Sequence, residues 1–299
     1  MQDENVRVSV IIPTYNPDYA LKRAIESVLQ QTFQDLELIV VDDASPDHPA
    51  ELITSPYSQV RLLRLPQNRG PSGARNVGIQ MSKGNLLAFL DHDDAWSPNY
   101  LEHQIRTLEA NKNCVLTFCD VVESDDNQTY SLCNFKPWLG YPQLTRKILL
   151  TQDIISTMSI VVVRREAMLK AGLLDESLKI CHDKELYLRL LYEGEIIHLP
   201  ETLVTRFIHS NNLSRNKHTL LAEEDQRTIE IFFSDQRSLP YRSLLPEARS
   251  YAALRRAKVT KWSSGNYFFA LRMFFMALWF SPSYTFRNVL TSLKSKYLS

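Results

Sequence analysis

Short apolar runs alternate with amphipathic segments along the first 120 residues of the chain. The runs are rich in β-branched side chains, and they occupy residues 8–12, 36–41, 60–65, 86–90 and 114–122. Residues 18–31 place apolar side chains at helical spacing, and residues 72–81 are expected to form a further helix. Nearly continuous apolar strands that alternate with helices are typical of a parallel sheet with both faces covered. The pattern therefore predicts an α/β fold with a mostly parallel sheet flanked by helices.

The alternation is less regular after residue 122. Residues 160–163 indicate another strand, and residues 165–171 and 184–192 indicate helices. Gly172 is expected to end the first of these helices, because glycine readily adopts the left-handed conformation found after a helix.

Beyond about residue 222 the chain changes to predicted helices rich in aromatic residues and arginine. We therefore expect a first domain over residues 1–225, with halves at about 1–122 and 123–225. A helical C-terminal region is expected over residues 226–299.

Polar side chains follow the predicted strands directly. Asn16, Asp42, Asp43, Asp91 and Asp93 all lie just past a strand end. Because the carboxyl ends of parallel strands meet at one edge of a sheet, we expect these side chains to line that edge. Ligands of open α/β sheets bind at the same edge.

The densest of these polar groups is the Asp-His-Asp-Asp segment at residues 91–94. Carboxylates clustered in one turn repel one another unless a cation lies among them. Mg²⁺ or Mn²⁺ would resolve this repulsion, typically by binding one or two carboxylates together with substrate phosphate oxygens. The alternative is a solvated acidic turn, or a cap for a helix predicted to start at Ser97-Pro98 with Ser97 as its N-cap.

Five segments, in this order, resemble the motifs of family 2 glycosyltransferases of the GT-A fold. Each motif is weak by itself, whereas the ordered set is highly specific, and the resemblance covers roughly residues 6–220. The motifs are VIIPTYN at 10–16, VVDDAS at 40–45, NRGPSGARNVG at 68–78, FLDHDD at 89–94 and DKELYLRL at 183–190.

The resemblance implies a metal-dependent inverting glycosyltransferase that uses Mn²⁺ or Mg²⁺. Such an enzyme moves one sugar from a nucleotide-diphosphate sugar to a hydroxyl acceptor, in polysaccharide, lipid-linked glycan or glycoconjugate synthesis. UDP is the nucleotide expected from family frequency, while dTDP and GDP stay open. The first half, 1–122, is expected to bind the nucleotide sugar, and the second half, 123–225, the acceptor.

The resemblance also assigns roles on the donor side. Pro13, Thr14, Tyr15 and Asp43 match residues that contact the base, and Arg75 matches an arginine that supports the base-binding carboxylate. Two further positions complete this side of the site. Asp91 is expected towards the ribose and Asp93 on the metal.

His209 matches a histidine that in some relatives reaches the metal or the diphosphate, with a purely structural role as the alternative. Asp183 matches the family's general base, which takes a proton from the attacking hydroxyl. His182 stands where the family often has Glu, so it either contacts the acceptor, modulates the base or has no catalytic part. Asp175 and Glu176 match an acceptor-side stretch, where they either hydrogen-bond a sugar or cap a turn.

Two other functions stay open. A sugar nucleotidyltransferase would need a Gly-rich loop bearing Lys or Arg after the first strand, where this chain has Pro13-Thr14-Tyr15-Asn16. A non-catalytic nucleotide or carbohydrate-binding module would have no need of all the candidate carboxylates together.

Charge is distributed unevenly along the 299 residues. The chain has 34 basic and 34 acidic residues, which argues against nucleic-acid binding driven by overall positive charge. Residues 240–299, however, hold ten basic residues and one acidic, a net charge of +9. This asymmetry suggests an interaction surface in the C-terminal region.

Residues 267–280 are apolar almost all round a predicted helix. Such a helix either packs on the catalytic domain or a second subunit of a homodimer, or lies in the interface of an anionic membrane, where it would help with lipid-linked acceptors. The acidic N-terminus does not resemble a signal peptide, and no apolar run reaches the roughly 18 residues of a spanning helix. We therefore expect a cytoplasmic protein, or one at the periphery of the inner face of the cell membrane.

Overall fold

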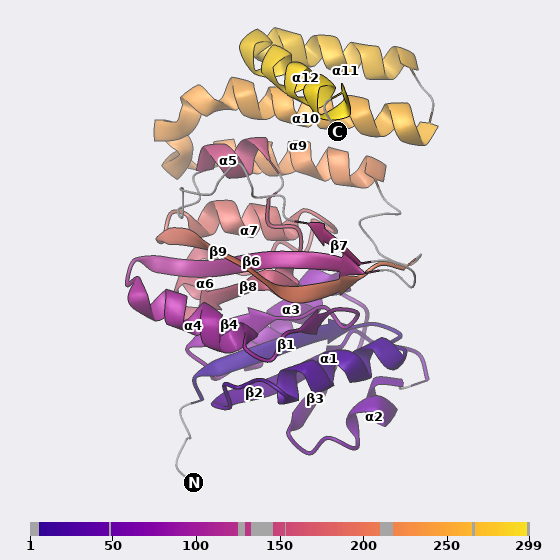
Figure 1. Ribbon diagram of the computed structural model, residues 1–299, viewed down its shortest axis with the longest axis vertical. Coiled ribbons are helices and arrows are strands. Elements are labelled where there is room, and N and C mark those ends of the chain that lie inside the picture. The colour runs from indigo at the N-terminus through magenta and orange to yellow at the C-terminus, as the bar shows by residue number, and fades with distance from the viewer. Residues whose placement is uncertain are drawn as a thin grey trace. The chain divides into compact units, whose positions relative to one another are not determined.

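The computed structural model describes residues 6–47, 49–124, 129–132, 146–152, 154–209, 218–264 and 267–297 (Figure 1). The chain divides into two compact units. The first comprises residues 1–144 and 154–209, and the second comprises residues 145–153 and 210–299. The boundary expected at residue 225 falls within helix α9, His218–Ser234, and the functional division of the chain stays a prediction.

The first unit is built on one mixed sheet, in which the described strands run in the order β3-β2-β1-β4-β8-β6-β9-β5, with β7 paired to β6. Its first four strands are parallel, as the apolar runs predict: β1 Val8–Thr14, β2 Leu36–Asp42, β3 Val60–Arg64 and β4 Leu86–Phe89. The α/β class is confirmed. Strands β1, β2 and β4 are largely buried because helices cover both faces, whereas β3, at the edge of the sheet, is only half-buried.

The other half of the sheet is of mixed direction. Strand β8, Val161–Arg164, lies antiparallel between β4 and β6, Cys114–Ser124, whereas β9, Glu195–Phe207, runs parallel to β6. Two short strands complete this half, β5 Ala95–Trp96 against β9 and β7 Thr129–Leu132 against β6, both antiparallel. Strands β5, β7 and β9 are not evident in the hydrophobic pattern.

Helices of the first unit lie on both faces of the sheet (Figure 1). The N-terminus of α4, Tyr100–Ala110, is tied to the C-terminal end of α1, Tyr19–Leu29, because the Gln31 side chain accepts the Leu101 N–H group at 2.9 Å. On the other face, α3, Gly70–Met81, is tied to the chain after α6, Arg165–Ala171, since Asn76 bonds both the N–H and the C=O group of Leu174. The remaining helices of this unit are α2 Pro49–Thr54, η2 Met158–Ile160 and α7 His182–Leu190.

The ends of two helices test the expectations from sequence. Gly172 follows α6 with a φ of 86°, so the predicted helix end is confirmed. The helix predicted to start at Ser97-Pro98 begins at Tyr100 instead. Ser97 continues the pairing with β9, because its N–H group donates to the Leu203 carbonyl at 2.8 Å, and a turn from Ser97 to Tyr100 precedes the helix.

The second unit is a helical bundle formed by α5 Arg146–Thr151, α9 His218–Ser234, η3 Gln236–Leu244, α10 Leu245–Ser264, α11 Tyr267–Phe280 and α12 Pro282–Tyr297. Helix α10 packs against α5, α9, α11 and α12. Buried polar contacts fix these helices: Ser250 bonds Thr285 at 2.8 Å, and Arg255 pairs with the fully buried Asp225 carboxylate at 2.5 Å. Among the described residues, no helix has the length and hydropathy needed to cross a membrane.

Gly78 sets how closely α3 approaches the sheet. A Cβ atom at this position would lie 2.5 Å from Cγ2 of Ile11 in β1 and 3.3 Å from Cγ2 of Val41 in β2. Both neighbours are fully buried, so they cannot move aside without disturbing the core.

We predict that Gly78→Ala lowers the free energy of unfolding by about 1–3 kcal/mol, because overpacking outweighs the gain in helix propensity. Urea denaturation followed by circular dichroism measures this change. The control is Gln80→Ala at an exposed position of the same helix. Equal stability of Gly78→Ala and the wild type would contradict the predicted close contact.

Candidate functional site

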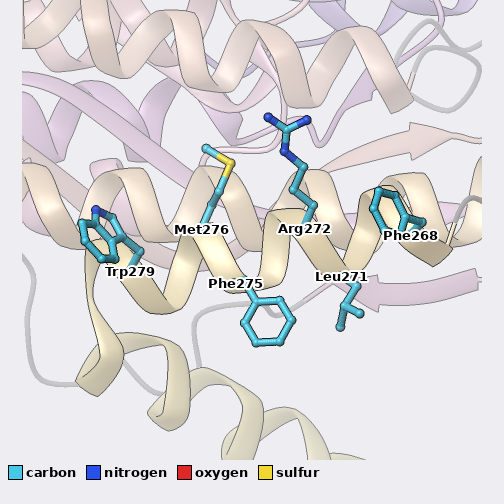
Figure 2. A pocket seen from close by; sticks show the side chains of 6 residues that line it. All are labelled: Phe268, Leu271, Arg272, Phe275, Met276 and Trp279. Atoms are coloured by element: carbon cyan, nitrogen blue, oxygen red, sulfur yellow. The ribbon is translucent and has the colours of Figure 1, made fainter.

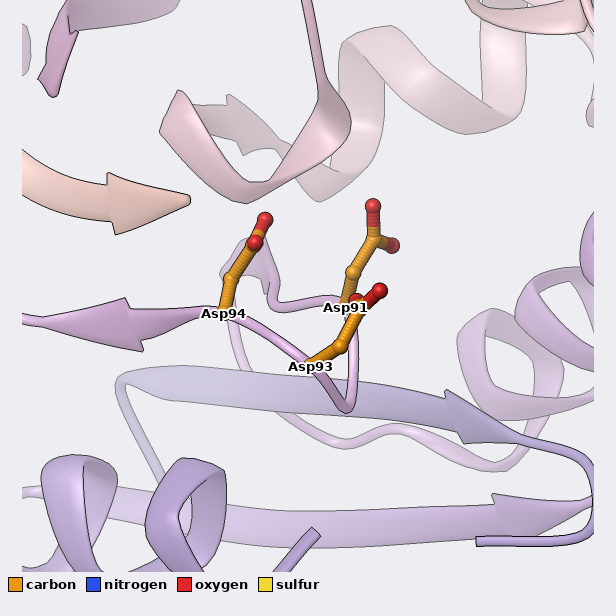
Figure 3. A group of neighbouring side chains, drawn as sticks. All are labelled: Asp91, Asp93 and Asp94. Atoms are coloured by element: carbon orange, nitrogen blue, oxygen red, sulfur yellow. The ribbon is translucent and has the colours of Figure 1, made fainter. Parts of the chain in front are cut away.

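The acidic segment at residues 91–94 forms a tight turn between β4 and β5. The Asp94 N–H group donates to the Asp91 carbonyl at 3.0 Å, which closes the turn. One oxygen from each of Asp91, Asp93 and Asp94 lies within 4.8 Å of the others, and the three carboxylates point to the same side (Figure 3). The turn therefore presents a concentrated set of hard oxygen ligands at the carboxyl end of β4.

Asp91 is held in place by three neighbours. Arg75 of α3 forms an ion pair with its Oδ1 atom, and the Thr157 hydroxyl donates to Oδ2 at 3.1 Å. Its own N–H group donates to the Ser159 hydroxyl at 3.0 Å. Burial raises the pKa of Asp91, but Arg75 and the Thr157 hydrogen bond outweigh it, so the pKa lies below its usual range. The carboxylate is therefore ionised and fixed in orientation.

The pKa of Asp94 is shifted in the opposite direction to that of Asp91. Burial, and then the negative charges of Asp91 and Asp93, raise its pKa well above the usual range. The Ser159 hydroxyl donates to Oδ2 at 2.6 Å and only partly offsets this effect. A divalent cation beside the three carboxylates would remove the repulsion, so the residues present fit Mn²⁺ or Mg²⁺.

His209 joins this cluster from a distant part of the chain. Its Nε2 atom lies 2.8 Å from Oδ2 of Asp93. The sheet explains the approach, because Ala95 of β5 pairs with Thr205 of β9 in antiparallel register. The chain leaving β9 is thereby directed to the acidic turn. The family resemblance implies a position near the metal or the diphosphate for His209.

Arg23 is a residue of this site that the sequence analysis missed. From α1, its Nη2 atom donates to the Asp93 carbonyl at 2.8 Å. The guanidinium carbon lies 3.5 Å from the ring centroid of Phe207, the last residue of β9. Arg23 therefore connects the acidic turn to the strand that leads to His209. The only sequence signal is an arginine that borders the apolar face of a helix directly after β1.

The loops after β1 and β2 carry residues that the sequence analysis expects on the donor side. The Asn16 N–H group donates to the Ser45 hydroxyl at 2.7 Å, and that hydroxyl bonds Asp42. Both loops turn sharply, with φ of 48° at Asn16 and 61° at Ala44. Tyr15, next to Asn16, is 52% exposed, so its ring is available to a ligand.

Asp43 directly follows β2, and its buried carboxylate contacts the backbone at the start of α3. Its Oδ1 atom accepts the Arg69 N–H group at 2.7 Å, and Gly70 adds a second backbone hydrogen bond. Burial raises the pKa of Asp43 more than these bonds lower it. Pro13 and Thr14 are buried beside it on β1, and the Thr14 hydroxyl has no partner among the described residues. Arg75, expected to support the base-binding carboxylate, pairs with Asp91 instead of Asp43.

His182 is buried at the start of α7. Its Nε2 atom lies 3.1 Å from Nη1 of Arg75, and it is 6% exposed. Burial, and then the Arg75 charge, lower its pKa to about 3, so the ring is neutral near pH 7. This nitrogen of His182 is engaged by Arg75, and the choice among acceptor contact, modulation of the base and no catalytic part stays a prediction. Asp183 follows it, half-buried, and its Oδ1 accepts the Lys184 N–H group at 2.7 Å.

Asp175 and Glu176 make intramolecular contacts. Asp175 accepts the N–H group of Ser177 at 2.8 Å and its hydroxyl at 2.6 Å, which is the turn-capping alternative. Glu176 forms a two-pronged ion pair with Arg69, at 2.5 and 3.2 Å, and accepts a hydrogen bond from Asn76 at 3.0 Å. Both carboxylates thus brace the chain after α6, and their expected contact with an acceptor sugar stays a prediction.

Comparison with known proteins identifies the family. A sequence model described as Glycosyl transferase family 2 matches residues 9–171, which include the acidic turn and the loops after β1 and β2. The chain belongs to glycosyltransferase family 2. The family expected from the sequence motifs is thereby confirmed.

Similar proteins include an uncharacterized glycosyltransferase of Rickettsia prowazekii, 35% identical over 207 residues. That match covers 68% of this chain and 64% of the relative, so the chain spans less than two thirds of the relative's length. An Escherichia coli protein named UDP-Glc:alpha-D-GlcNAc-diphosphoundecaprenol beta-1,3-glucosyltransferase WfgD is 39% identical over 105 residues, or 35% of this chain and 42% of that protein.

Among solved structures, the mannosyltransferase PcManGT from Pyrobaculum calidifontis, in complex with GDP-Man and Mn²⁺, superposes with a TM-score of 0.67. The match covers 98% of this chain and 81% of that structure at 16% identity, so it shows a shared fold. The GT-A fold expected from the sequence motifs is thereby confirmed.

We predict that Arg23→Met weakens Mn²⁺ binding roughly tenfold, because the acidic turn loses a hydrogen bond from a charged donor and its link to Phe207. Electron paramagnetic resonance of free Mn²⁺, without donor sugar, measures this affinity. Lys22→Met, the same substitution at the next residue, is the control and should leave the affinity unchanged. Arg23→Met with wild-type Mn²⁺ affinity would show that Arg23 does not position the turn.

Proposed function

We propose that this chain is a metal-dependent inverting glycosyltransferase that moves one sugar from a nucleotide-diphosphate sugar to a hydroxyl acceptor. The observation that carries the proposal is the chain of contacts from His182 through Arg75 to Asp91. This chain of contacts brings the helix that bears Asp183 to the acidic turn. This supports the proposal that the candidate base and the candidate metal site belong to one site.

The donor is proposed to lie along the loops after β1 and β2. Tyr15 offers an exposed ring on which a base can stack, and Pro13, Thr14 and Asp43 border it. UDP is favoured, and the Escherichia coli relative, whose name gives UDP-Glc as its donor, supports this choice. GDP remains an alternative, since the structural neighbour binds GDP-Man, and dTDP also stays open.

The metal site is proposed to use Asp93, with His209 beside it and Asp91 facing the ribose. Bound Mn²⁺ or Mg²⁺ would neutralise the negative charge that develops on the departing diphosphate. The protein's own part is to hold these ligands before the donor arrives. Arg75 keeps Asp91 ionised, and Arg23 holds the Asp93 backbone.

Asp183 is proposed to act as the general base. The N-terminus of α7 favours negative charge at its position, and the Lys184 N–H group orients the carboxylate. In the proposed reaction, Asp183 takes the proton of the acceptor hydroxyl while that oxygen bonds the anomeric carbon on the face opposite the diphosphate. The bond to the diphosphate breaks with its electron pair, so the anomeric configuration inverts and no second protein acid is needed.

The acceptor is proposed to be a glycan or a lipid-linked sugar. The name of the Escherichia coli relative, which gives a diphosphoundecaprenol-linked acceptor, supports this class. Residues 123–225 are proposed to bind it, after residues 1–122 have bound the donor. We also propose that the protein works at the inner face of the cell membrane, with the basic residues 240–299 nearest the lipid.

A sugar nucleotidyltransferase is disfavoured by the loop after β1. That loop carries Pro13 and Asn16 in place of a glycine-rich, lysine-bearing turn. A thermal-shift screen of UDP, dTDP and GDP sugars, with and without Mn²⁺, tests donor binding directly. Selective stabilisation by one nucleotide sugar supports the proposal, because the shift grows with site occupancy; stabilisation by a nucleoside triphosphate and a sugar phosphate would favour the nucleotidyltransferase.

We predict that Asp183→Asn lowers the rate of sugar transfer at least about a hundredfold, because amide nitrogen and oxygen cannot accept the hydroxyl proton. Incorporation of radiolabelled sugar into a lipid-linked acceptor measures the rate. Donor binding in the thermal-shift assay should stay at the wild-type level. Full activity of this variant would refute the assignment of the base.

Asp93→Asn, unlike Asp183→Asn, should change donor binding. We predict that this variant loses the Mn²⁺-dependent part of donor binding. Removing one carboxylate charge weakens a hard-cation site while keeping the shape of the side chain. Isothermal titration with the donor, with and without Mn²⁺, separates the two contributions. Glu166→Gln, at a side chain 79% exposed on α6, is the matched control. A Mn²⁺ response equal to that of the wild type would exclude Asp93 as a ligand.

A further inference from the structure

Helix α11 of the second unit has two apolar faces. Its inner face consists of the buried residues Ala270, Met273 and Ala277, and the helix packs against α10 and α12. Its outer face carries larger side chains that no other part of the described second unit covers. Phe268 is 83% exposed and Trp279 is 86% exposed, although both are large and aromatic.

The outer side chains form one stripe along the helix. Phe268, Leu271, Phe275 and Trp279 follow at intervals of three or four residues, which is the repeat of one helical face. Figure 2 shows Leu271 and Phe275 projecting from the same side, while Arg272 and Met276 project from the other. These six side chains line a shallow groove of about 460 Å³.

A stripe of this kind is unfavourable in water. Single exposed apolar side chains are ordinary on protein surfaces, whereas a continuous apolar patch marks an interaction surface. The patch here combines two phenylalanines, a leucine and a tryptophan with an arginine at its edge. Tryptophan and arginine are the side chains that favour the boundary between lipid and water.

Charge decides between the candidate occupants. Residues 240–299 hold ten basic residues and the single acid Glu247, a net charge of +9. Lys258, Arg272 and Arg287 are exposed on α10, α11 and α12. A second copy docked on the same face would bring two strongly positive surfaces together. An anionic bilayer instead attracts basic side chains near its surface.

We propose that the outer face of α11 is an interfacial anchor that inserts Phe268, Leu271, Phe275 and Trp279 among the headgroups of an anionic bilayer. Arg272 lies at the edge of the stripe, where its aliphatic stem can follow the apolar side chains while the guanidinium meets phosphate. The helix lies in the plane of the interface. The inference identifies the surface for the membrane location proposed above, and it does not depend on Asp183, the metal or the donor.

Sedimentation with vesicles tests the anchor on the full chain. Vesicles of phosphatidylcholine and phosphatidylglycerol in equal parts should bind the protein, and vesicles of phosphatidylcholine alone should bind it far less. Phe275→Ser with Trp279→Ser should reduce binding to the anionic vesicles about tenfold or more, since two large apolar side chains leave the lipid interface. Tyr19→Ser, which changes a 72% exposed aromatic residue of the first unit, is the matched control and should bind as the wild type.

A second, conservative variant distinguishes loss of the anchor from loss of folding. Trp279→Phe retains an aromatic ring, so it should bind the anionic vesicles within about twofold of the wild type while losing the blue shift of tryptophan emission that vesicles cause. The anchor is overturned if the wild type ignores anionic vesicles, or if the double serine variant binds them undiminished. It is also overturned if the double serine variant converts a dimer into a monomer in analytical ultracentrifugation, since a second copy would then be the occupant. Thermal shift with nucleotide sugars, measured on the same variants, reports separately on the donor site.

Discussion

The ion pair between Arg75 and Asp91 is the interaction on which the site depends. Three carboxylates lie in one turn, and burial together with mutual repulsion opposes their ionisation, as the raised pKa of Asp94 shows. Arg75 compensates one of them and contacts His182 with its other terminal nitrogen. One buried guanidinium from α3 thereby joins the turn after β4 to the start of α7. Such a buried charge is tolerated because it is paired with the Asp91 carboxylate and also hydrogen-bonds the neutral His182 ring.

The sheet supplies the second constraint. Strand β5 has only two residues, Ala95 and Trp96, yet its pairing with β9 brings a segment more than a hundred positions later in the chain to the acidic turn. Arg23 secures the same junction from α1. Because the turn is held by backbone pairing and by side chains from separate elements, its carboxylates are positioned before any ligand arrives. Preorganisation of this kind is what electrostatic catalysis requires.

The sequence predicted the first half of the sheet well because local pattern decides those elements. Strands β1, β2 and β4 are largely buried and therefore mostly apolar, and α1 carries a clear apolar stripe. Strand β9 escaped notice because Glu195, His198 and Glu201 interrupt its apolar residues, and its pairing with β6 is a long-range contact. For the same reason the motifs placed Arg75 at the site but not its partner, and Arg23 belongs to no motif. Long-range partners are properties of the folded chain.

Helix α5 has a consequence for how such proteins can change. It belongs to the second unit, although it is encoded between two strands of the first, and the Tyr284 hydroxyl of α12 donates to its Thr151 carbonyl at 3.0 Å. The chain therefore enters the helical bundle, returns to the sheet and enters the bundle again. A gene fusion that exchanged only the last ninety or so codons would separate α5 from the helices against which it packs. Recombination among relatives should preserve residues 146–151 and the C-terminal helices as one inherited set, despite the long stretch of sequence between them.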